Sequence, residues 1–238
     1  MILLRSLLFN LIFWLSVPVY APLALLTFPL PYRWRYRLIS AWARFHTWLA
    51  KVLLRIDYTV EGREHLPTGA AILLGKHQST WETIAFQTIF PMQTWVLKRE
   101  LMWIPLFGWA LTLMKPIAIN RGAGRKAVEQ VVEQGRERLH EGIWVVIFPE
   151  GTRTAPGQRR RYGLGGAVLA EASGYPVVPV AHNAGHFWPR RKAIKQPGTV
   201  RVVIGPAIDP RGLTAAEINR RAEAWIESTV ARLEGRAT

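Results

Sequence analysis

The chain has 238 residues, half of them hydrophobic, so it is long enough to bury a full core as one domain. Its 31 Lys and Arg against 16 Asp and Glu give a formal net charge of +15, which points to a polyanionic partner such as nucleic acid or an anionic lipid surface. The absence of cysteine excludes a disulfide scaffold, a cysteine-based zinc site and a thiol nucleophile, and leaves histidine as the main candidate for proton transfer near neutral pH.

The first predicted element is an apolar segment without a charged side chain between Arg5 and Arg33, a stretch of 27 residues. This length passes the threshold of about 18 residues for a membrane span. Four prolines interrupt the segment, however, and the proline-free piece from Ser6 to Val17 would reach only about 18 Å as a helix, against a hydrocarbon core of about 30 Å. The pattern therefore favours a re-entrant or half-buried membrane element.

The next segment combines cations with an apolar helical stripe. Arg33, Arg35 and Arg37 open it. Apolar residues then recur at three- and four-residue spacing, namely Leu38, Trp42, Phe45, Leu49 and Val52. This pattern is typical of an amphipathic helix in the membrane interface, with its cations facing anionic head groups. We therefore predict that residues 1–55 form a membrane-anchoring helical segment.

A cleaved signal peptide is the alternative for the N-terminus, because Arg5, the apolar run and the small-residue site at Val19–Ala21 fit its usual outline. Pro22 directly after that site and the apolar residues that continue to Leu30 favour retention of the segment. Because the flanking residues are basic, we expect the protein at the cytoplasmic membrane with its catalytic domain on the cytoplasmic side.

From residue 56 onward, strand patterns alternate with helical ones. The predicted strands are Tyr58–Val60, Ala70–Leu74, Thr94–Leu97, Pro116–Asn120, Ile143–Phe148, Val177–Ala181 and Val200–Ile204. The clearest helices are Thr80–Phe90, Gly124–His140 and Thr214–Leu233. This alternation predicts that residues 56–238 form an α/β domain, with a mixed, largely parallel sheet flanked by helices.

The first candidate motif, Gly75 to Glu82, lies where an apolar strand gives way to a helix, and ligand sites in α/β sheets favour such strand ends. Transfer of an acyl group to an alcohol needs a neutral imidazole to accept the hydroxyl proton and a carboxylate to hold the ring in the right tautomer. His77 and Glu82 would lie about 140° apart on one straight helix. The pair therefore requires His77 in the turn and Glu82 in the first helical turn.

The same residues also have purely structural interpretations. Ser79-x-x-Glu82 is itself a capping box, so Glu82 can equally serve helix N–H groups. A single histidine such as His77 is often a structural residue whose hydrogen bonds are satisfied. Ser79 is an alternative nucleophile, but it lacks the Gly-x-Ser-x-Gly elbow of a lipid esterase.

The second motif, Phe148-Pro149-Glu150-Gly151-Thr152-Arg153, directly follows another apolar strand. An ordinary type I turn explains its proline and glycine but not the Glu150 and Arg153 pair, which such a turn would project at the strand end. Arg153 offers a fork for a phosphate, and Arg121, after a third strand, offers another cation. Either arginine is alternatively a solvated surface charge.

With both motifs in this order and 73 residues from His77 to Glu150, the chain resembles the glycerolipid acyltransferases, and among them the 1-acylglycerol-3-phosphate acyltransferases. The resemblance extends over roughly residues 55–210. The family hallmark is a His-x4-Asp block followed by Phe-Pro-Glu-Gly-Thr-Arg. The resemblance implies that His77 is a general base oriented by Glu82. It further implies that the acceptor is bound by Arg121, Glu150, Gly151, Thr152 and Arg153, the two arginines contacting its phosphate.

The sequence departs from the family pattern at three positions. Glu82 replaces the usual aspartate, Asn120 replaces an acidic residue, and Gly163 stands where many relatives have lysine. The longer glutamate can still reach the imidazole. The missing lysine puts one expected cation in doubt, although Arg159–Arg161 lie just upstream and can compensate.

The implied reaction moves a fatty acyl group from an acyl carrier protein or coenzyme A thioester to the free hydroxyl of 1-acylglycerol-3-phosphate, giving phosphatidic acid. The resemblance implies no metal and no cofactor beyond the acyl donor. Another lysolipid, such as a lyso-aminolipid, is the alternative acceptor. A basic nucleic-acid-binding protein is the alternative from another class, suggested by the charge and by Arg159–Arg161 and Arg190–Lys192. It would leave the apolar N-terminus unexplained, so we expect an anionic membrane surface as partner and no nucleic acid.

Overall fold

The structure is a computed structural model that describes residues 1–236 and, for Arg121, the main chain only. Its helices and strands follow in the order α1 (Ile2–Leu25), α2 (Tyr32–Leu49), β1 (Ile56–Glu61), β2 (Ile72–Gly75), α3 (Trp81–Ile89), β3 (Gln93–Lys98), α4 (Phe107–Thr112), β4 (Ile117–Ile119), α5 (Arg125–His140), β5 (Trp144–Ile147), α6 (Gly165–Ser173), β6 (Val177–His182), α7 (Ala184–Phe187), β7 (Gly198–Ile204) and α8 (Ala215–Leu233). A π-helical turn, Ala50–Leu54, prolongs α2 toward β1. Each predicted strand is confirmed with shifted ends, whereas α4, α6 and α7 were not predicted.

The strands form one seven-stranded sheet in the order β1-β7-β6-β2-β5-β3-β4. All neighbouring pairs are parallel except β6 and β7, which are antiparallel. The predicted fold class, a mixed and largely parallel sheet flanked by helices, is therefore confirmed. The order also makes β6, β2 and β5 direct neighbours, so the loops after these three strands meet at one edge of the sheet.

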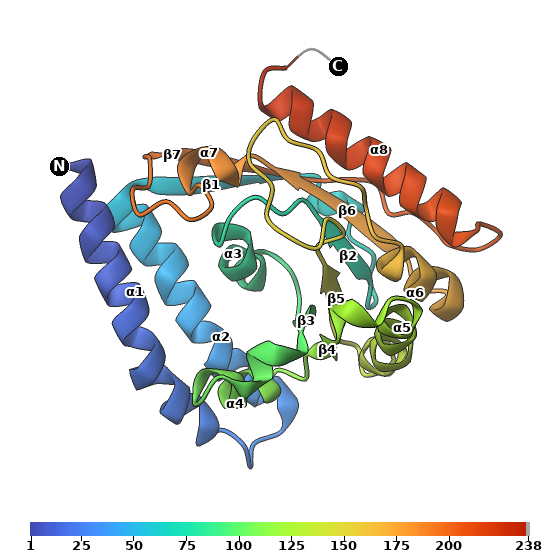
Figure 1. Ribbon diagram of the computed structural model, residues 1–238, viewed down its shortest axis with the longest axis horizontal. Coiled ribbons are helices and arrows are strands. Elements are labelled where there is room, and N and C mark those ends of the chain that lie inside the picture. Colours follow the sequence, from blue (N-terminus) through green and yellow to red (C-terminus); the bar gives the residue numbers. More distant parts are fainter. Residues whose placement is uncertain (237–238) are drawn as a thin grey trace.

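Both faces of the sheet are covered, as the continuous apolar runs in its strands require. Successive side chains of a strand point to opposite faces. Leu73 accordingly packs in a core with α3 and the N-terminal helices, whereas Ile72 and Leu74 pack in a second core under α5, α6 and α8. Figure 1 shows this arrangement, with α1, α2 and α3 on one side of the sheet and α5, α6 and α8 on the other.

The prediction that prolines interrupt the N-terminal segment after Val17 is wrong, because α1 runs without a break from Ile2 to Leu25 and contains Pro18 and Pro22. Each proline lacks an N–H and costs the helix one hydrogen bond, but the following turn persists, with the Leu26 N–H donating to the Pro22 carbonyl. Close packing of Ala21 and Ala24 against Ala110 of α4 supports this part of the helix. The 24 residues span about 36 Å, so by length and composition α1 can cross a membrane.

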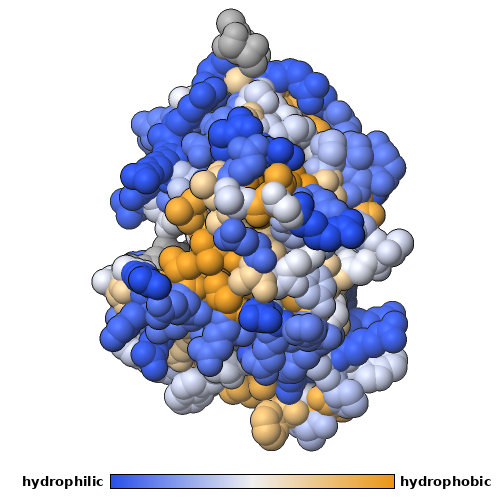
Figure 2. Space-filling view, turned by 90° about the vertical axis from the view of Figure 1, so that its right-hand side faces the viewer, coloured by the Kyte–Doolittle hydropathy of each residue, from blue (hydrophilic) through white to orange (hydrophobic). Residues whose placement is uncertain are grey.

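One face of α1 is docked on the protein and the other is apolar and exposed. Phe9 is fully buried and packs edge-on against Trp188, and the Trp42 indole N–H of α2 donates to Ser16. Large hydrophobic side chains on the outer face are exposed, including Leu4, Leu11, Trp14, Val19 and Leu23. Figure 2 views the opposite side, from α5 and α6, where the surface is mostly hydrophilic around one apolar hollow.

The second N-terminal helix, α2, packs its small residues inward and leaves large ones outside. Ser40 and Ala43 are buried, whereas Leu38, Phe45 and Val52 of the predicted apolar stripe are exposed. Leu49, the stripe residue nearest β1, belongs to the same core as the sheet. The predicted division at residue 55 therefore separates segments that share one hydrophobic core.

Candidate active site

His77 and Glu82 meet at the carboxyl end of β2. The Nδ1 atom of His77 lies 2.9 Å from Oε1 of Glu82, the imidazole is in the turn after the strand, and Glu82 is the second residue of α3. This is the geometry that the sequence required for the pair. The imidazole also stacks on the Phe148 ring, with centroids 4.1 Å apart and planes inclined by 14°. Phe148 thereby covers one face of the imidazole. Of the His77 side chain, 14% stays accessible to solvent.

The Glu82 carboxylate combines the two roles that the sequence left open. Its Oε1 accepts the main-chain N–H groups of Gln78 and Ser79 at 2.9 and 2.7 Å, in addition to facing the imidazole. Burial raises the pKa of this fully buried carboxyl, but the nearby histidines and the hydrogen bonds from His77 and Ser79 outweigh it, so its pKa is lowered. An ionised Glu82 favours the tautomer with the proton on Nδ1 of His77 and leaves Nε2 with a lone pair.

Ser79 is engaged as a structural residue. Its hydroxyl donates to the Trp188 carbonyl at 2.6 Å and accepts the Trp81 N–H at 3.0 Å. The side chain is fully buried. A nucleophilic role would require these hydrogen bonds to break, so the geometry favours the imidazole as the reacting group.

A second histidine, His182 at the end of β6, lies behind Glu82. Its Nε2 donates to the Lys76 carbonyl at 2.8 Å and lies 4.0 Å from Oε2 of Glu82, while its Nδ1 accepts the Ala184 N–H at 3.2 Å. Burial lowers the pKa of His182, and the Glu82 charge partly offsets this. His182 therefore joins the β6 and β2 ends through the main chain of the residue that precedes His77.

Glu150, predicted to be part of the acceptor pocket, points into the protein. Its Oε2 accepts the His77 N–H at 2.8 Å, and its Oε1 accepts the Lys76 ammonium at 2.7 Å and the Thr154 hydroxyl at 2.9 Å. Burial raises the pKa of Glu150, and the Lys76 charge partly offsets this. Both carboxylate oxygens thus serve the loop that carries His77.

The buried ion network around Lys76 was not predicted from the sequence. Besides Glu150, the Lys76 ammonium contacts Glu227 of α8 at 2.7 Å, and the Tyr162 hydroxyl donates to the same Glu227 oxygen at 2.8 Å. The side chain of Lys76 is 1% exposed. Lys76 and Glu227 are 151 residues apart, so no local pattern connects them. The available signal was that each is a charged residue next to buried apolar positions, Lys76 after a strand and Glu227 within a helix.

The second motif forms the predicted turn, and the residue after Arg153 is bonded to the main chain of His77. The Gly151 N–H donates to the Phe148 carbonyl at 3.0 Å, and Gly151 has a φ of +67° that suits glycine. The Thr154 N–H donates to the His77 carbonyl at 2.8 Å, which ties this loop to the turn that carries His77. Thr152 and Arg153 are half-buried between these points.

Arg153 lies close to two other arginines, Arg190 and Arg191. Burial lowers the pKa of its guanidinium, the Glu82 charge raises it, and the neighbouring charges of Arg190 and Arg191 lower it further. Arg190 also donates to the Arg153 carbonyl at 2.7 Å. No carboxylate forms an ion pair with these three arginines within residues 1–236, so the cluster favours an anionic ligand.

Arg121 follows β4, whose carboxyl end lies at the same edge of the sheet as that of β5. Its main chain starts a short helical turn, in which the Asn120 carboxamide accepts the Gly122 N–H at 3.0 Å. The side chain of Arg121 lies outside the described part of the chain. Its predicted contact with the acceptor therefore stays a prediction.

Comparison with known proteins agrees with these motifs. The acyltransferase family profile matches residues 57–183, which run from β1 past the end of β6. A 1-acyl-sn-glycerol-3-phosphate acyltransferase of Pseudomonas aeruginosa is 46% identical over 97% of this chain and 91% of its own length. A human enzyme, 1-acyl-sn-glycerol-3-phosphate acyltransferase beta, is 30% identical over 62% of this chain and 54% of its own.

A solved structure extends the agreement to the whole fold. The crystal structure of the 1-acyl-sn-glycerophosphate acyltransferase PlsC from Thermotoga maritima superimposes with a TM-score of 0.80, at 24% identity and with all of both chains covered. This similarity includes the N-terminal helices as well as the sheet. The family match and the relative from Pseudomonas aeruginosa together show that the chain belongs to the acyltransferase family.

Proposed function

We propose that the protein transfers a fatty acyl group from an acyl thioester to the free hydroxyl of 1-acyl-sn-glycerol-3-phosphate and so makes phosphatidic acid. The observation that carries this proposal is the His77–Glu82 pair, 2.9 Å apart, on a loop bonded to the loop of Arg153. The substrate class follows the names of the relatives, above all the one 46% identical over nearly the whole chain.

In the proposed mechanism, Nε2 of His77 accepts the proton of the acceptor hydroxyl as its oxygen attacks the thioester carbonyl. Glu82 stabilises the imidazolium that forms, as a buried carboxylate does in other acid–base triads. The tetrahedral intermediate then collapses, the C–S bond breaks, and the thiol leaves with the proton returned by His77. No acyl-enzyme forms, in keeping with the Ser79 hydroxyl being bonded to Trp188.

Arg153 supplies the charge for the acceptor phosphate in this proposal, with Arg121 as a second contact. A guanidinium presents parallel N–H donors that match a phosphate, and Arg153 is half-buried without a carboxylate ion pair among the described residues. Gly151 and Thr152 shape the pocket between the phosphate and the reacting hydroxyl. Glu150 supports the site from the protein interior, because it accepts hydrogen bonds from the main-chain N–H of His77 and from the ammonium of Lys76.

We further propose that α1 and the exposed stripe of α2 hold the enzyme at the cytoplasmic membrane, where both the acceptor and the product reside. The outer face of α1 is apolar, and the cations Arg33, Arg35 and Arg37 begin α2. Basic residues at a membrane boundary favour the cytoplasmic side. Buried contacts of Ser6 and Phe9 with the rest of the protein support retention of the N-terminal segment rather than its cleavage.

The test is an assay of the purified protein with labelled acyl carrier protein and coenzyme A thioesters and a panel of lysolipids. We expect esterification of 1-acyl-sn-glycerol-3-phosphate, and its loss in His77→Ala with unchanged membrane binding after a salt wash. A preference for a lyso-aminolipid would correct the acceptor. Normal activity of His77→Ala would refute the catalytic assignment.

A further inference from the structure

A cavity of about 560 Å³ lies between α2, β1 and α3, away from the catalytic residues. Its lining includes Arg44 and Thr47 of α2, Tyr58 of β1, Arg63, and Thr88 of α3. Strand β1 is an edge strand, three positions from β2 in the sheet. At about 4.8 Å per strand, this places β1 about 14 Å from the strand that carries His77.

The cavity has excess positive charge. Lys51 pairs with Asp57 at 2.8 Å, and both side chains are well exposed, so this ion pair accounts for the one carboxylate in the lining. Arg44 and Arg63 remain, and neither forms an ion pair with a carboxylate anywhere in residues 1–236. Two guanidinium groups without a counter-charge on one cavity favour an anionic ligand.

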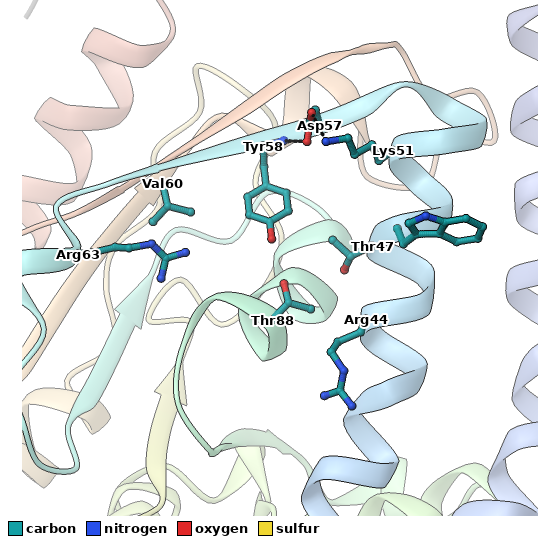
Figure 3. A pocket seen from close by; sticks show the side chains of 9 residues that line it. Arg44, Thr47, Lys51, Asp57, Tyr58, Val60, Arg63 and Thr88 are labelled. Atoms are coloured by element: carbon teal, nitrogen blue, oxygen red, sulfur yellow. Dashed lines mark hydrogen bonds and ion pairs between the residues drawn. The ribbon is translucent and has the colours of Figure 1, made fainter.

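The two guanidinium groups are oriented by neutral acceptors and keep N–H groups for a ligand. Arg44 donates to the Ser40 hydroxyl at 2.8 Å and to the Arg37 carbonyl at 2.7 Å, and Arg63 donates to the Ile89 carbonyl at 3.2 Å. A guanidinium carries five N–H donors, so each has several left. In Figure 3, Arg63 reaches in from one side and the Tyr58 hydroxyl points from β1 toward Thr47 and Thr88. Arg44 extends along α2, so its guanidinium lies at the far margin of the cavity.

The flank of the cavity is apolar and faces outward. Trp48 lines the cavity and is 56% exposed, and Phe45 and Val52, at three and four residues from it on the same face of the helix, are 44% and 58% exposed. A free inorganic anion would make no contact with these apolar side chains, whereas a lipid has both a charged head group and apolar chains that could bind there. We propose that this cavity binds the phosphate head group of an anionic phospholipid of the membrane, whose acyl chains lie along the exposed face of α2.

This site is separate from the acceptor site, since its lining contains none of His77, Glu82 and Arg153. Its role would be to seat the enzyme on anionic regions of the bilayer at a fixed orientation. The inference does not depend on the proposed reaction, because lipid retention can be measured without acyl transfer.

The test is native mass spectrometry of the full chain in a neutral detergent, with equal amounts of added phosphatidylglycerol and phosphatidylcholine. We expect the wild type to retain phosphatidylglycerol in preference, and Arg44→Gln/Arg63→Gln to weaken this retention by about tenfold or more. The matched control is Arg125→Gln/Arg136→Gln, which removes two exposed charges from α5. Melting temperatures without lipid check that the variants fold, and Arg63→Gln alone serves if the double variant does not.

Two further arms separate the possible ligands. Arg153→Ala should keep the preference for phosphatidylglycerol, and if it alone loses the preference, the lipid occupies the acceptor site and the inference fails. Inorganic phosphate that displaces the lipid at equal concentration would identify the ligand as a free anion and overturn the lipid assignment. Unchanged retention in the Arg44→Gln/Arg63→Gln variant would overturn the site itself.

Discussion

Glu82→Gln isolates the charge of the Glu82 carboxylate from its geometry. The Oε1 atom accepts three N–H groups, from the His77 ring and from the main chains of Gln78 and Ser79, and a carboxamide oxygen can accept all three. The new NH2 group would replace Oε2, which has no hydrogen-bond partner among the described residues and lies 4.0 Å from His182. We therefore expect the variant to fold with the imidazole in place but without the negative charge beside it.

The size of the effect follows from the separation of the two charges. The facing atoms are 2.9 Å apart, which puts the centres of an imidazolium and a carboxylate about 4 Å apart, worth about 4 kcal/mol at an effective dielectric constant of about 20. Each 1.36 kcal/mol corresponds to about a factor of ten in rate. The turnover number should therefore fall by about a thousandfold if the ring is fully protonated in the transition state, and by about thirtyfold if half the charge has developed.

The assay follows release of the free thiol from an acyl thioester at saturating lysophosphatidate, with the melting temperature as a check of folding. The acceptor KM should stay near the wild-type value, because the Glu82 side chain is fully buried and offers no surface to the acceptor. Glu217→Gln on the surface of α8, where the carboxylate pairs with Arg220 and Arg221, is the matched control and should keep full activity. A turnover number of Glu82→Gln within threefold of the wild type would refute the role of Glu82 in charge stabilisation.

Three further predictions concern other parts of the protein. Lys76→Met removes the buried counter-charge between Glu150 and Glu227 and leaves Glu227 facing the exposed Arg159 at 3.5 Å, so the free energy of unfolding should fall by about 3–5 kcal/mol. A thermal melt measures this, and no recovery in Lys76→Met/Glu227→Leu would contradict the electrostatic cause. Arg153→Ala should raise the acceptor KM by roughly tenfold to a hundredfold, with a smaller change in the turnover number. Initial rates measured over a range of acceptor concentrations test this, and an unchanged KM would exclude a phosphate contact. Burial lowers the pKa of Lys195 to about 8, so the unfolded chain binds the extra proton between pH 8 and its ordinary pKa of about 10.4. Stability should therefore rise with pH in that window, and the same slope in Lys195→Met would show another group to be responsible.

The sequence determined those features that depend on a few neighbouring residues. Short runs rich in apolar and β-branched residues predicted all seven strands, and those of β2, β5 and β6 are apolar enough to bury both faces. Helical periodicity predicted α5 and α8. The two motifs could be placed at strand ends for the same reason. The contact between His77 and Glu82 was one of two open interpretations of the residues, and the family resemblance favoured it over a capping role alone.

Short or crowded elements were harder to predict. Helices α4, α6 and α7 have 6, 9 and 4 residues, and each contains at least one glycine, so none of the three shows a clear helical period. The prolines of α1 carried a local signal for a break, but packing of Ala21 and Ala24 on α4 and the hydrogen bonds around Ser16 keep the helix continuous. Tertiary contacts outweighed the local cost of the prolines.

Only the tertiary structure decided which distant groups meet. The inward direction of Glu150, its bond to the His77 N–H and the Lys76–Glu227 pair depend on β5 lying beside β2 and on α8 covering that edge. The cationic cavity likewise combines residues of α2, β1 and α3 that no motif connects. Strand order and helix docking bring these groups together, and both are set by the burial of whole faces rather than by any short stretch of the chain.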